Sequence, residues 1–392
     1  MVPESADGAL GAFLADPANL PLDLTTSVAG SARALGLANA VVYLADLQQR
    51  QLAPLNATVP ALPIDASLAG WCYRTQSLRV DEHHHGGMVA WLPLVDGAER
   101  LGVLGVTAPA LDPEALRRGR TLAALCALMI TSKRAYEDSF VHTARTDAMT
   151  LPAEMLRAYL PPRTIGCTRA LSTAVLEPAY ELGGDAFEHD LTDTALHAGV
   201  LDAVGHDLAS GLVAVLALAA ARNARRVGAD LHDLVDSADA ALSRWLPDKF
   251  CTAIFARLDL TTGRLRWINC GHPPPLLIRD HRLVAHALDR DPEPPMGLPA
   301  VLASVTRHVH EAALEPGDRV LMYTDGVTEA RAADGSQFGL DRFADYVIRA
   351  AAAGEPPAET LRRLIHSLLE AQDHRLGDDA TILMFEWCPQ PD

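Results

Sequence analysis

Four segments of the sequence place a carboxylate close to glycine at the end of an apolar or strand-like run. The candidate residues are Asp185, Asp202, Asp325 and the Asp378-Asp379 pair. Glycine lets the backbone turn sharply and approach a ligand closely. A charged group at the edge of a core costs free energy unless something pairs with it. If these segments meet in one cleft, the carboxylates would repel one another strongly unless they are neutralised.

Hard divalent cations are the natural partners of such a cluster. Mg²⁺ and Mn²⁺ prefer carboxylate, carbonyl and water oxygens as ligands. Two such ions roughly 3.5–4 Å apart would lower the pKa of a bridging water and hold phosphate oxygens. The pattern therefore predicts metal-assisted hydrolysis of a phosphate ester, although a single Asp-Gly pair is more often only a turn.

The elements that must position these carboxylates are indicated by hydrophobic periodicity. Apolar runs predict strands at 171–177, 194–203, 275–279, 319–324 and 381–386. The segments TAIFARLDL (252–260) and RLRWINCG (264–271) predict a β-hairpin around a Thr-Thr-Gly turn. Helices are expected at roughly 208–227, 231–244, 341–352 and 358–372. Hairpins together with long helices predict antiparallel sheets covered by helices, an α+β fold.

The first part of the chain predicts a separate module. Residues 1–135 contain strand-like runs at 40–46, 88–95 and 100–108, and Asp112-Pro113 then predicts the start of a long helix. Residues 136–165 are charged, with helical stretches that end at Pro161-Pro162, and predict a helical linker. Residues 166–392 would form the domain that carries the aspartates.

The module at 1–135 resembles a GAF domain, an α/β sensor domain. The resemblance is carried by SLAGWCYRTQSLRV (67–80), followed by WLPLVDGAERLGVLGVTA (91–108). It implies a small-molecule, redox or light sensor, or a dimerisation module, and it names no ligand. A homodimer formed through this domain and the linker helix is therefore one of the arrangements that the resemblance allows.

The acidic segments occur in an order that resembles the metal-dependent PPM-type serine/threonine phosphatases, in the bacterial branch similar to SpoIIE. The matching segments are ELGGD (181–185), LDAVGHD (201–207), NCGHPPP (269–275), PMG (295–297), YTDGVTEA (323–330) and DDAT (378–381). The resemblance implies a central β-sandwich between helical layers, αββα, with two metal ions at one edge.

Carried over residue by residue, the resemblance also implies roles. Asp185 and Asp202 would hold or bridge two Mn²⁺ or Mg²⁺ ions, and the backbone carbonyl of Ala203 would add a ligand. Asp325 and Asp378 would complete the shell of the second ion. The substrate implied is phosphoserine or phosphothreonine on a regulatory protein, such as an anti-sigma-factor antagonist.

Two histidines and one departure from the family pattern have alternative interpretations. His206 would be a general acid that protonates the leaving serine oxygen, or a structural histidine in a glycine turn. His272 is expected to be structural, tying its hairpin to a neighbour. Asp207 stands where the family usually has glycine. It would recruit a further metal ion, weaken phosphate binding, or cap the helix at 208–227, and we favour the cap.

Composition excludes several classes of partner. The 392-residue chain has 33 basic and 50 acidic residues and a net charge of −17, with no basic stripe for a nucleic acid. Six scattered cysteines without a Cys-x-x-Cys pair favour a reducing cytoplasm. No signal peptide is visible. The longest apolar run, 212–221, is shorter than the roughly 18–20 residues of a membrane span.

Two rival functions remain. The first is a non-catalytic signalling module, in which the second domain only binds partners. The second is a two-metal nucleotide cyclase, which also uses paired aspartates. Retention of all four metal-binding aspartates argues against the first rival. The segments at 269–272 and 378–381 fit a phosphatase better than a cyclase.

Overall fold

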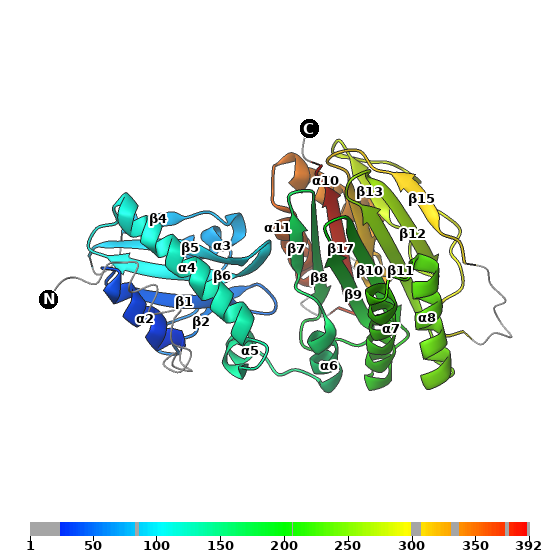
Figure 1. Cartoon of the computed structure of the whole chain (residues 1–392), viewed down its shortest axis with the longest axis horizontal. Coiled ribbons are helices and arrows are strands. Elements are labelled where there is room, and N and C mark those ends of the chain that lie inside the picture. The colour runs from blue at the N-terminus through cyan, green and yellow to red at the C-terminus, as the bar shows by residue number, and fades with distance from the viewer. Residues whose placement is uncertain are drawn as a thin grey trace. The chain divides into compact units, whose positions relative to one another are not determined.

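The computed structural model describes residues 24–82, 86–205, 207–298, 307–330, 337–372 and 376–389 (Figure 1). The chain divides into two compact units, Met1–Asp147 and Ala148–Asp392. This division lies inside the segment 136–165, for which the sequence predicts a linker. Phe140 packs in the core of the first unit, whereas Ala153 and Leu156 pack in the core of the second. Each unit therefore has a core of its own.

The described part of the first unit is built on a six-stranded antiparallel sheet with the order β3-β2-β1-β6-β5-β4. The strands are β1 (Asn39–Ala45), β2 (Gln51–Pro54), β3 (Leu62–Pro63), β4 (Arg79–Glu82), β5 (Met88–Asp96) and β6 (Glu99–Ala108). The predicted strands at 40–46, 88–95 and 100–108 are confirmed as β1, β5 and β6. These three strands are neighbours in the middle of the sheet.

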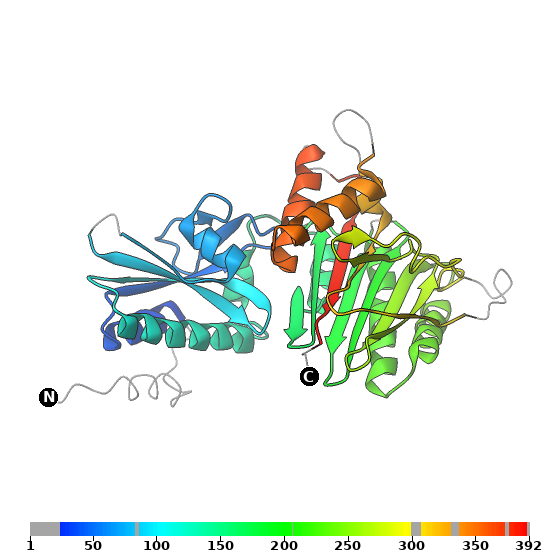
Figure 2. The ribbon, with the colours of Figure 1, turned by 90° about the horizontal axis from the view of Figure 1, so that it is seen from above.

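Helices cover both faces of this sheet (Figure 2). Helices α2 (Leu24–Ala34), α4 (Pro113–Lys133) and α5 (Asp138–Ala144) share one core with the sheet, and α3 (Leu68–Thr75) packs on the opposite face. The Asp112 carboxylate accepts the Ala115 N–H at 2.7 Å, and Pro113 follows in the first turn of α4. The sequence signal for the start of this helix is confirmed.

The described part of the second unit contains two sheets. A five-stranded sheet has the order β15-β12-β11-β10-β9, and a six-stranded sheet has the order β14-β13-β16-β17-β8-β7. The strands are β7 (Thr164–Cys167), β8 (Ala170–Glu177), β9 (Asp185–Leu191), β10 (Ala195–Ala203), β11 (Cys251–Asp259), β12 (Arg264–Cys270), β13 (Leu276–Arg279), β14 (Arg282–Leu283), β15 (His310–Ala313), β16 (Arg319–Tyr323) and β17 (Ala380–Trp387). All named pairs within the two sheets are antiparallel.

Strand β16 shows why the second unit has four layers. Val320 and Met322 face the core shared by the two sheets, whereas Leu321 and Tyr323 face a second core under helices. Because side chains alternate along a strand, burial on both faces produces a continuous apolar run. The helices are α6 (Leu151–Tyr159), α7 (Leu208–Arg226), α8 (Leu231–Trp245), α9 (Asp325–Thr328), α10 (Gly339–Ala352) and α11 (Pro357–Ala371).

Helices α6 to α8 pack with the five-stranded sheet, and α9 to α11 with the six-stranded sheet. The order helix, sheet, sheet, helix agrees with the predicted αββα layering.

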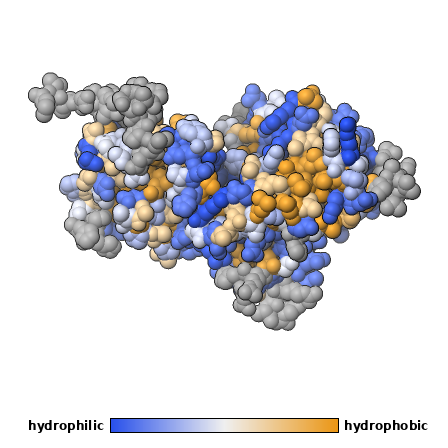
Figure 3. Space-filling view, turned by 90° about the horizontal axis from the view of Figure 1, so that it is seen from below, coloured by the Kyte–Doolittle hydropathy of each residue, from blue (hydrophilic) through white to orange (hydrophobic). Residues whose placement is uncertain are grey.

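Helix α7 begins at Leu208, after β10 in the chain, and is capped as expected. The Asp207 carboxylate accepts the Ser210 N–H at 3.0 Å, and Ser210 Oγ accepts the Asp207 N–H at 2.8 Å. Helix α7 is long and apolar enough to cross a membrane. Its buried apolar residues, however, belong to the core of the second unit. Leu208 and Leu212 are each 42% exposed, and apolar surface is visible on this unit in Figure 3.

Candidate active site

The predicted carboxylates lie where the two sheets of the second unit end together. Asp185 opens β9 and is paired in register with Asp202 near the end of β10. Directly opposed residues of an antiparallel pair have Cβ atoms about 4.5–5.5 Å apart on one face. In the other sheet, Asp325 follows β16, and Asp378 and Asp379 precede β17, its neighbour in the sheet.

Two threonine hydroxyls join the ends of the sheets. Thr324 Oγ1 and Thr381 Oγ1 both donate to Asp185 Oδ2, each at 2.7 Å. The Thr324 N–H donates to the Thr381 carbonyl at 3.1 Å, and the Thr381 N–H donates to Thr324 Oγ1 at 2.9 Å. The orientation of the Asp185 carboxylate is therefore fixed by residues of the opposite sheet.

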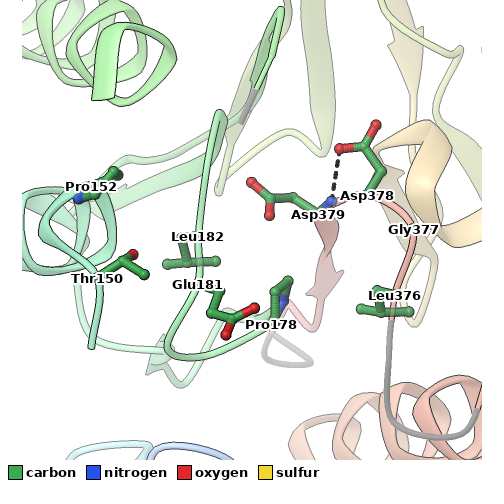
Figure 4. A pocket seen from close by; sticks show the side chains of 9 residues that line it. All are labelled: Thr150, Pro152, Pro178, Glu181, Leu182, Leu376, Gly377, Asp378 and Asp379. Atoms are coloured by element: carbon green, nitrogen blue, oxygen red, sulfur yellow. Dashed lines mark hydrogen bonds between the residues drawn. The ribbon is translucent and has the colours of Figure 1, made fainter. Parts of the chain in front are cut away.

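Asp379 holds the backbone of the loop that leads into Asp185. Its Oδ2 accepts the N–H groups of Gly183 at 2.8 Å, Gly184 at 2.9 Å and Asp185 at 3.2 Å. Asp379 is only 6% exposed, so these bonds satisfy a buried carboxylate. Figure 4 shows the side chains of Asp378 and Asp379 pointing in different directions from the segment before β17, and the Asp378 carboxylate accepts the Asp379 N–H at 2.9 Å.

Two glycines are required by close backbone contacts at this edge. A Cβ on Gly184 would lie 2.1 Å from the Ala203 carbonyl oxygen, and one on Gly326 would lie 2.0 Å from the Asp379 carbonyl oxygen. Both distances are far below van der Waals contact. The glycines beside Asp185 and Asp325 therefore let the four segments approach one another.

The electrostatics of the site are those of carboxylates that share a partly buried space. The pKa of Asp202 is raised to about 7, first by burial and then by repulsion from Asp325, Asp378 and Asp379. Burial, followed by the charges of Asp202 and Asp379, raises the pKa of Asp185 well above its usual range. Burial and Asp378 also raise the pKa of Asp325. A nearby cation would relieve this repulsion.

The structure places four of the predicted metal ligands, Asp185, Asp202, Asp325 and Asp378, at the same edge of the two sheets, where their charges interact. The carbonyl of Ala203 lies against Gly184, and the Ala203 N–H donates to the Gly184 carbonyl at 3.2 Å. His206 lies outside the described residues. Asp207 caps α7, as expected from the sequence.

The structural role expected for His272 agrees with its contacts. His272 Nδ1 lies 2.9 Å from Thr252 Oγ1 of β11, and the His272 N–H donates to Asn269 Oδ1 at 2.8 Å. Burial lowers the pKa of His272 to about 4, so its ring is neutral near neutral pH. This histidine therefore ties its hairpin to a neighbouring strand.

The donor chemistry fits a hard divalent cation. Among the described residues, no three His, Cys, Asp or Glu side chains are already gathered as a compact ligand set. Asp185 Oδ2 accepts the Thr324 hydroxyl, and Asp379 Oδ2 accepts backbone N–H groups. The groups at this edge are carboxylate, carbonyl and hydroxyl oxygens. Mg²⁺ and Mn²⁺ prefer oxygen ligands, whereas zinc and copper are commonly bound by cysteine and histidine.

A pocket of about 400 Å³ opens beside this edge (Figure 4). It is lined by Thr150, Pro152, Pro178, Glu181, Leu182, Leu376, Gly377, Asp378 and Asp379. Helix α6 is tied to the segment before the pocket wall at both of its ends. The Thr150 N–H donates to the Tyr180 carbonyl at 2.9 Å, and Arg157 Nε in the last turn donates to the Ala179 carbonyl at 2.7 Å. No sequence pattern predicts this pocket.

Comparison with protein families decides the assignment. The family described as stage II sporulation protein E (SpoIIE) matches residues 192–388, half of the chain. The chain belongs to the SpoIIE family. The SiaA-PP2C domain of Pseudomonas aeruginosa is 22% identical, with a TM-score of 0.51, and covers 66% of this chain and all of that one. The second unit of this SpoIIE-family chain therefore has the fold of a PP2C-type, or PPM-type, phosphatase domain.

Curated relatives are similar over part of their length. Phosphoserine phosphatase RsbP of Bacillus subtilis is 26% identical over 218 residues, 52% of this chain and 49% of RsbP. Protein IcfG of Synechocystis is 31% identical over 93 residues, 24% of this chain and 14% of IcfG. The chain thus spans about half of the length of RsbP and less of IcfG.

Proposed function

We propose that this chain is a metal-dependent protein serine/threonine phosphatase. The observation that supports the proposal most strongly is the gathering of Asp185, Asp202, Asp325 and Asp378 at one edge of a PP2C-type fold. Burial, followed by repulsion from Asp325, Asp378 and Asp379, raises the pKa of Asp202 to about 7, and bound cations would relieve that repulsion.

Each residue has a proposed role in this site. Asp185, Asp202 and the Ala203 carbonyl would hold one edge of a site for two Mn²⁺ or Mg²⁺ ions, and Asp325 and Asp378 the other. When bound, such ions lower the pKa of a coordinated water and neutralise phosphate oxygens. Thr324 and Thr381 would keep Asp185 oriented by donating to Oδ2. His206 stays a candidate general acid.

The proposed substrate is phosphoserine or phosphothreonine on a regulatory protein, such as an anti-sigma-factor antagonist. Similarity to a relative named phosphoserine phosphatase supports this choice. The edge beside Asp378 and Asp379 is open to a pocket of about 400 Å³, which offers room for a side chain of a protein substrate. The net charge of −17 disfavours a nucleic-acid partner. The scattered cysteines support a location in the cytoplasm.

The first unit is proposed to be a GAF-like sensor that controls the second. Support comes from its antiparallel sheet, covered by helices on both faces, and from the segments 67–80 and 91–108 that resemble a GAF domain. A homodimer through this unit and the linker helix of the segment 136–165 belongs to the same proposal. The sensor would act on a phosphatase that is complete within 148–392.

The rival functions are less well supported. Every predicted metal-binding aspartate lies at the shared edge, which disfavours a purely non-catalytic binding module. Membership of the SpoIIE family disfavours the nucleotide cyclase.

Hydrolysis of p-nitrophenyl phosphate and of a phosphoserine peptide by the full chain tests the proposal. We expect turnover with Mn²⁺ or Mg²⁺, none with EDTA, and a loss of about 100-fold or more in Asp325→Ala. The control Asp345→Ala removes an exposed carboxylate on α10 and should retain activity. Metal-independent turnover, or equal activity in Asp325→Ala, would exclude the proposed mechanism, and a cyclic product from ATP or GTP would favour the cyclase.

A further inference from the structure

The first unit contains a cavity of about 630 Å³ on the face of its sheet that carries α3. Its walls come from β1, β5 and β6, from the start of α3, and from the segment around Val59, Pro60 and Leu62. Small-molecule sites commonly measure about 300–1,000 Å³ and are mostly apolar with a few polar groups. The cavity therefore has the size of a small-molecule site.

The strand register places the indole ring of Trp91 on the floor of the cavity. Val41 of β1, Gly105 of β6 and Trp91 of β5 are neighbours in one row across the sheet, and all three line the cavity. A Cβ on Gly105 would lie 2.7 Å from Trp91 Cζ3, so the indole ring lies over the bare glycine. Tyr43 meets Trp91 edge-on, with ring centroids 5.8 Å apart. A planar molecule can therefore stack against this floor.

The next row of the sheet leads to an acidic rim. Asn39, Thr107, Val89 and Asp81 follow one another across β1, β6, β5 and β4, and all four line the cavity. Glu82 lines it as well, and both carboxylates are exposed.

No Lys, Arg or His occurs among the described residues that line the cavity. The nearest cation in the register is Arg79, opposite Trp91, and its guanidinium stacks over the Trp71 ring at 4.9 Å. The carboxylates of Asp81 and Glu82 therefore favour a positively charged group over a phosphate or carboxylate at this part of the rim.

We propose that this cavity binds a planar aromatic molecule that carries a protonated nitrogen. The ring system would stack on Trp91, and the nitrogen would face Asp81 and Glu82. The contact of a cation with tryptophan and the two carboxylates act in the same direction. This inference deepens the proposed sensor role of the first unit, and rests on that role only for the consequence of binding.

Calorimetric titration of the full chain with proflavine, a planar cationic acridine, tests this inference. We expect saturable binding with one proflavine per chain. The planar anion acridine-9-carboxylate should bind about tenfold more weakly or not at all, because the rim repels it. Absence of saturable proflavine binding, or equal affinity for the anion, would overturn the inference.

A matched pair of double variants separates the rim from general charge. Asp81→Asn with Glu82→Gln should weaken proflavine binding by about tenfold while the far-ultraviolet circular dichroism stays unchanged, because both side chains are exposed. Asp96→Asn with Asp138→Asn removes two exposed charges of the same unit away from the cavity and should have no effect. Equal weakening in both double variants would show non-specific attraction and contradict the proposal.

Binding and phosphatase activity can be judged separately. A chain that binds proflavine at the rim but hydrolyses no phosphate ester would refute the proposed function alone. An active phosphatase that fails to bind proflavine would refute this inference alone.

Discussion

At the scale of single residues, Asp185 has the most extensive support in the candidate site. Two hydroxyls from the opposite sheet donate to its Oδ2, and the backbone that precedes it is bound by Asp379. These partners lie 139 to 196 residues away in the sequence. A ligand of a metal ion needs this kind of outer support, because the partners fix the direction of its lone pairs.

Replacement of Asp379 by alanine should damage both folding and metal binding. The change leaves three buried N–H groups without their acceptor, and an unsatisfied buried group costs about 1–3 kcal/mol. We expect the free energy of unfolding in urea to fall by about 2–4 kcal/mol, and Mn²⁺ affinity to fall as the loop moves.

Asp379→Asn is the matched control for that prediction, since its amide oxygen can still accept the N–H bonds. It should remain closer to the native chain in both measurements. If the alanine and asparagine variants are equally stable and bind Mn²⁺ equally, Asp379 does not hold the loop.

The metal-free chain should become less stable as the pH rises from about 4 to about 7. The folded-state pKa of Asp202 is about 7, above the ordinary value of 3.8 for an aspartate, so the native chain retains a proton that the unfolded chain has lost. The resulting destabilisation at pH 7.5 is on the order of 2–4 kcal/mol. Tm measured with EDTA should therefore fall between pH 5 and pH 7.5 by more in the native chain than in Asp202→Asn. Equal falls would show that Asp202 carries no such shift.

The carboxylates could be predicted from sequence because each stands beside glycine at the end of an apolar run. Thr324, Thr381 and the N–H bonds of Asp379 could not. No local sequence pattern around Thr324 or Thr381 indicates that its hydroxyl donates to a carboxylate in the other sheet. Their role follows from the meeting of two sheet ends, which only the three-dimensional arrangement shows.

At the scale of elements, the site depends on close approach of the segment after β16 to the segment before β17. Gly326→Ala would place a Cβ 2.0 Å from the Asp379 carbonyl oxygen, so one backbone segment must move. We expect a lower Tm and a loss of Mn²⁺-dependent activity of about tenfold or more.

Gly377→Ala is the control for this prediction. Gly377 lines the pocket beside Asp378, but a Cβ on it would meet nothing within 4 Å. It should leave Tm and activity close to native. Equal effects of the two substitutions would contradict the requirement for close approach at Gly326.

Long elements were predictable from the sequence, and short ones were not. Strands β16 and β17 are buried on both faces and therefore produce continuous apolar runs. Strands β3 and β14 have two residues each, too few to show a period. The chain between Lys133 and Asp138 breaks a helical stretch into α4 and α5 without any glycine or proline to mark the break.

At the scale of the whole molecule, the two units have separate cores. Cores of the first unit draw on residues 24–140, and cores of the second on residues 153–387. The fragment 148–392 should therefore fold alone, unfold cooperatively, and hydrolyse p-nitrophenyl phosphate with Mn²⁺. Thermal unfolding followed by circular dichroism checks the first two points. An unfolded or metal-insensitive fragment would show that the second unit is incomplete without the first.

The central claim is that distant aspartates form one site for a pair of cations, and calorimetric titration with Mn²⁺ measures it most directly. The native chain, freed of metal, should bind two Mn²⁺ ions, and Asp202→Asn should lose at least one of them while its circular dichroism stays native. A native chain that takes up no Mn²⁺, or an Asp202→Asn variant that binds two ions with native affinity, would contradict the account.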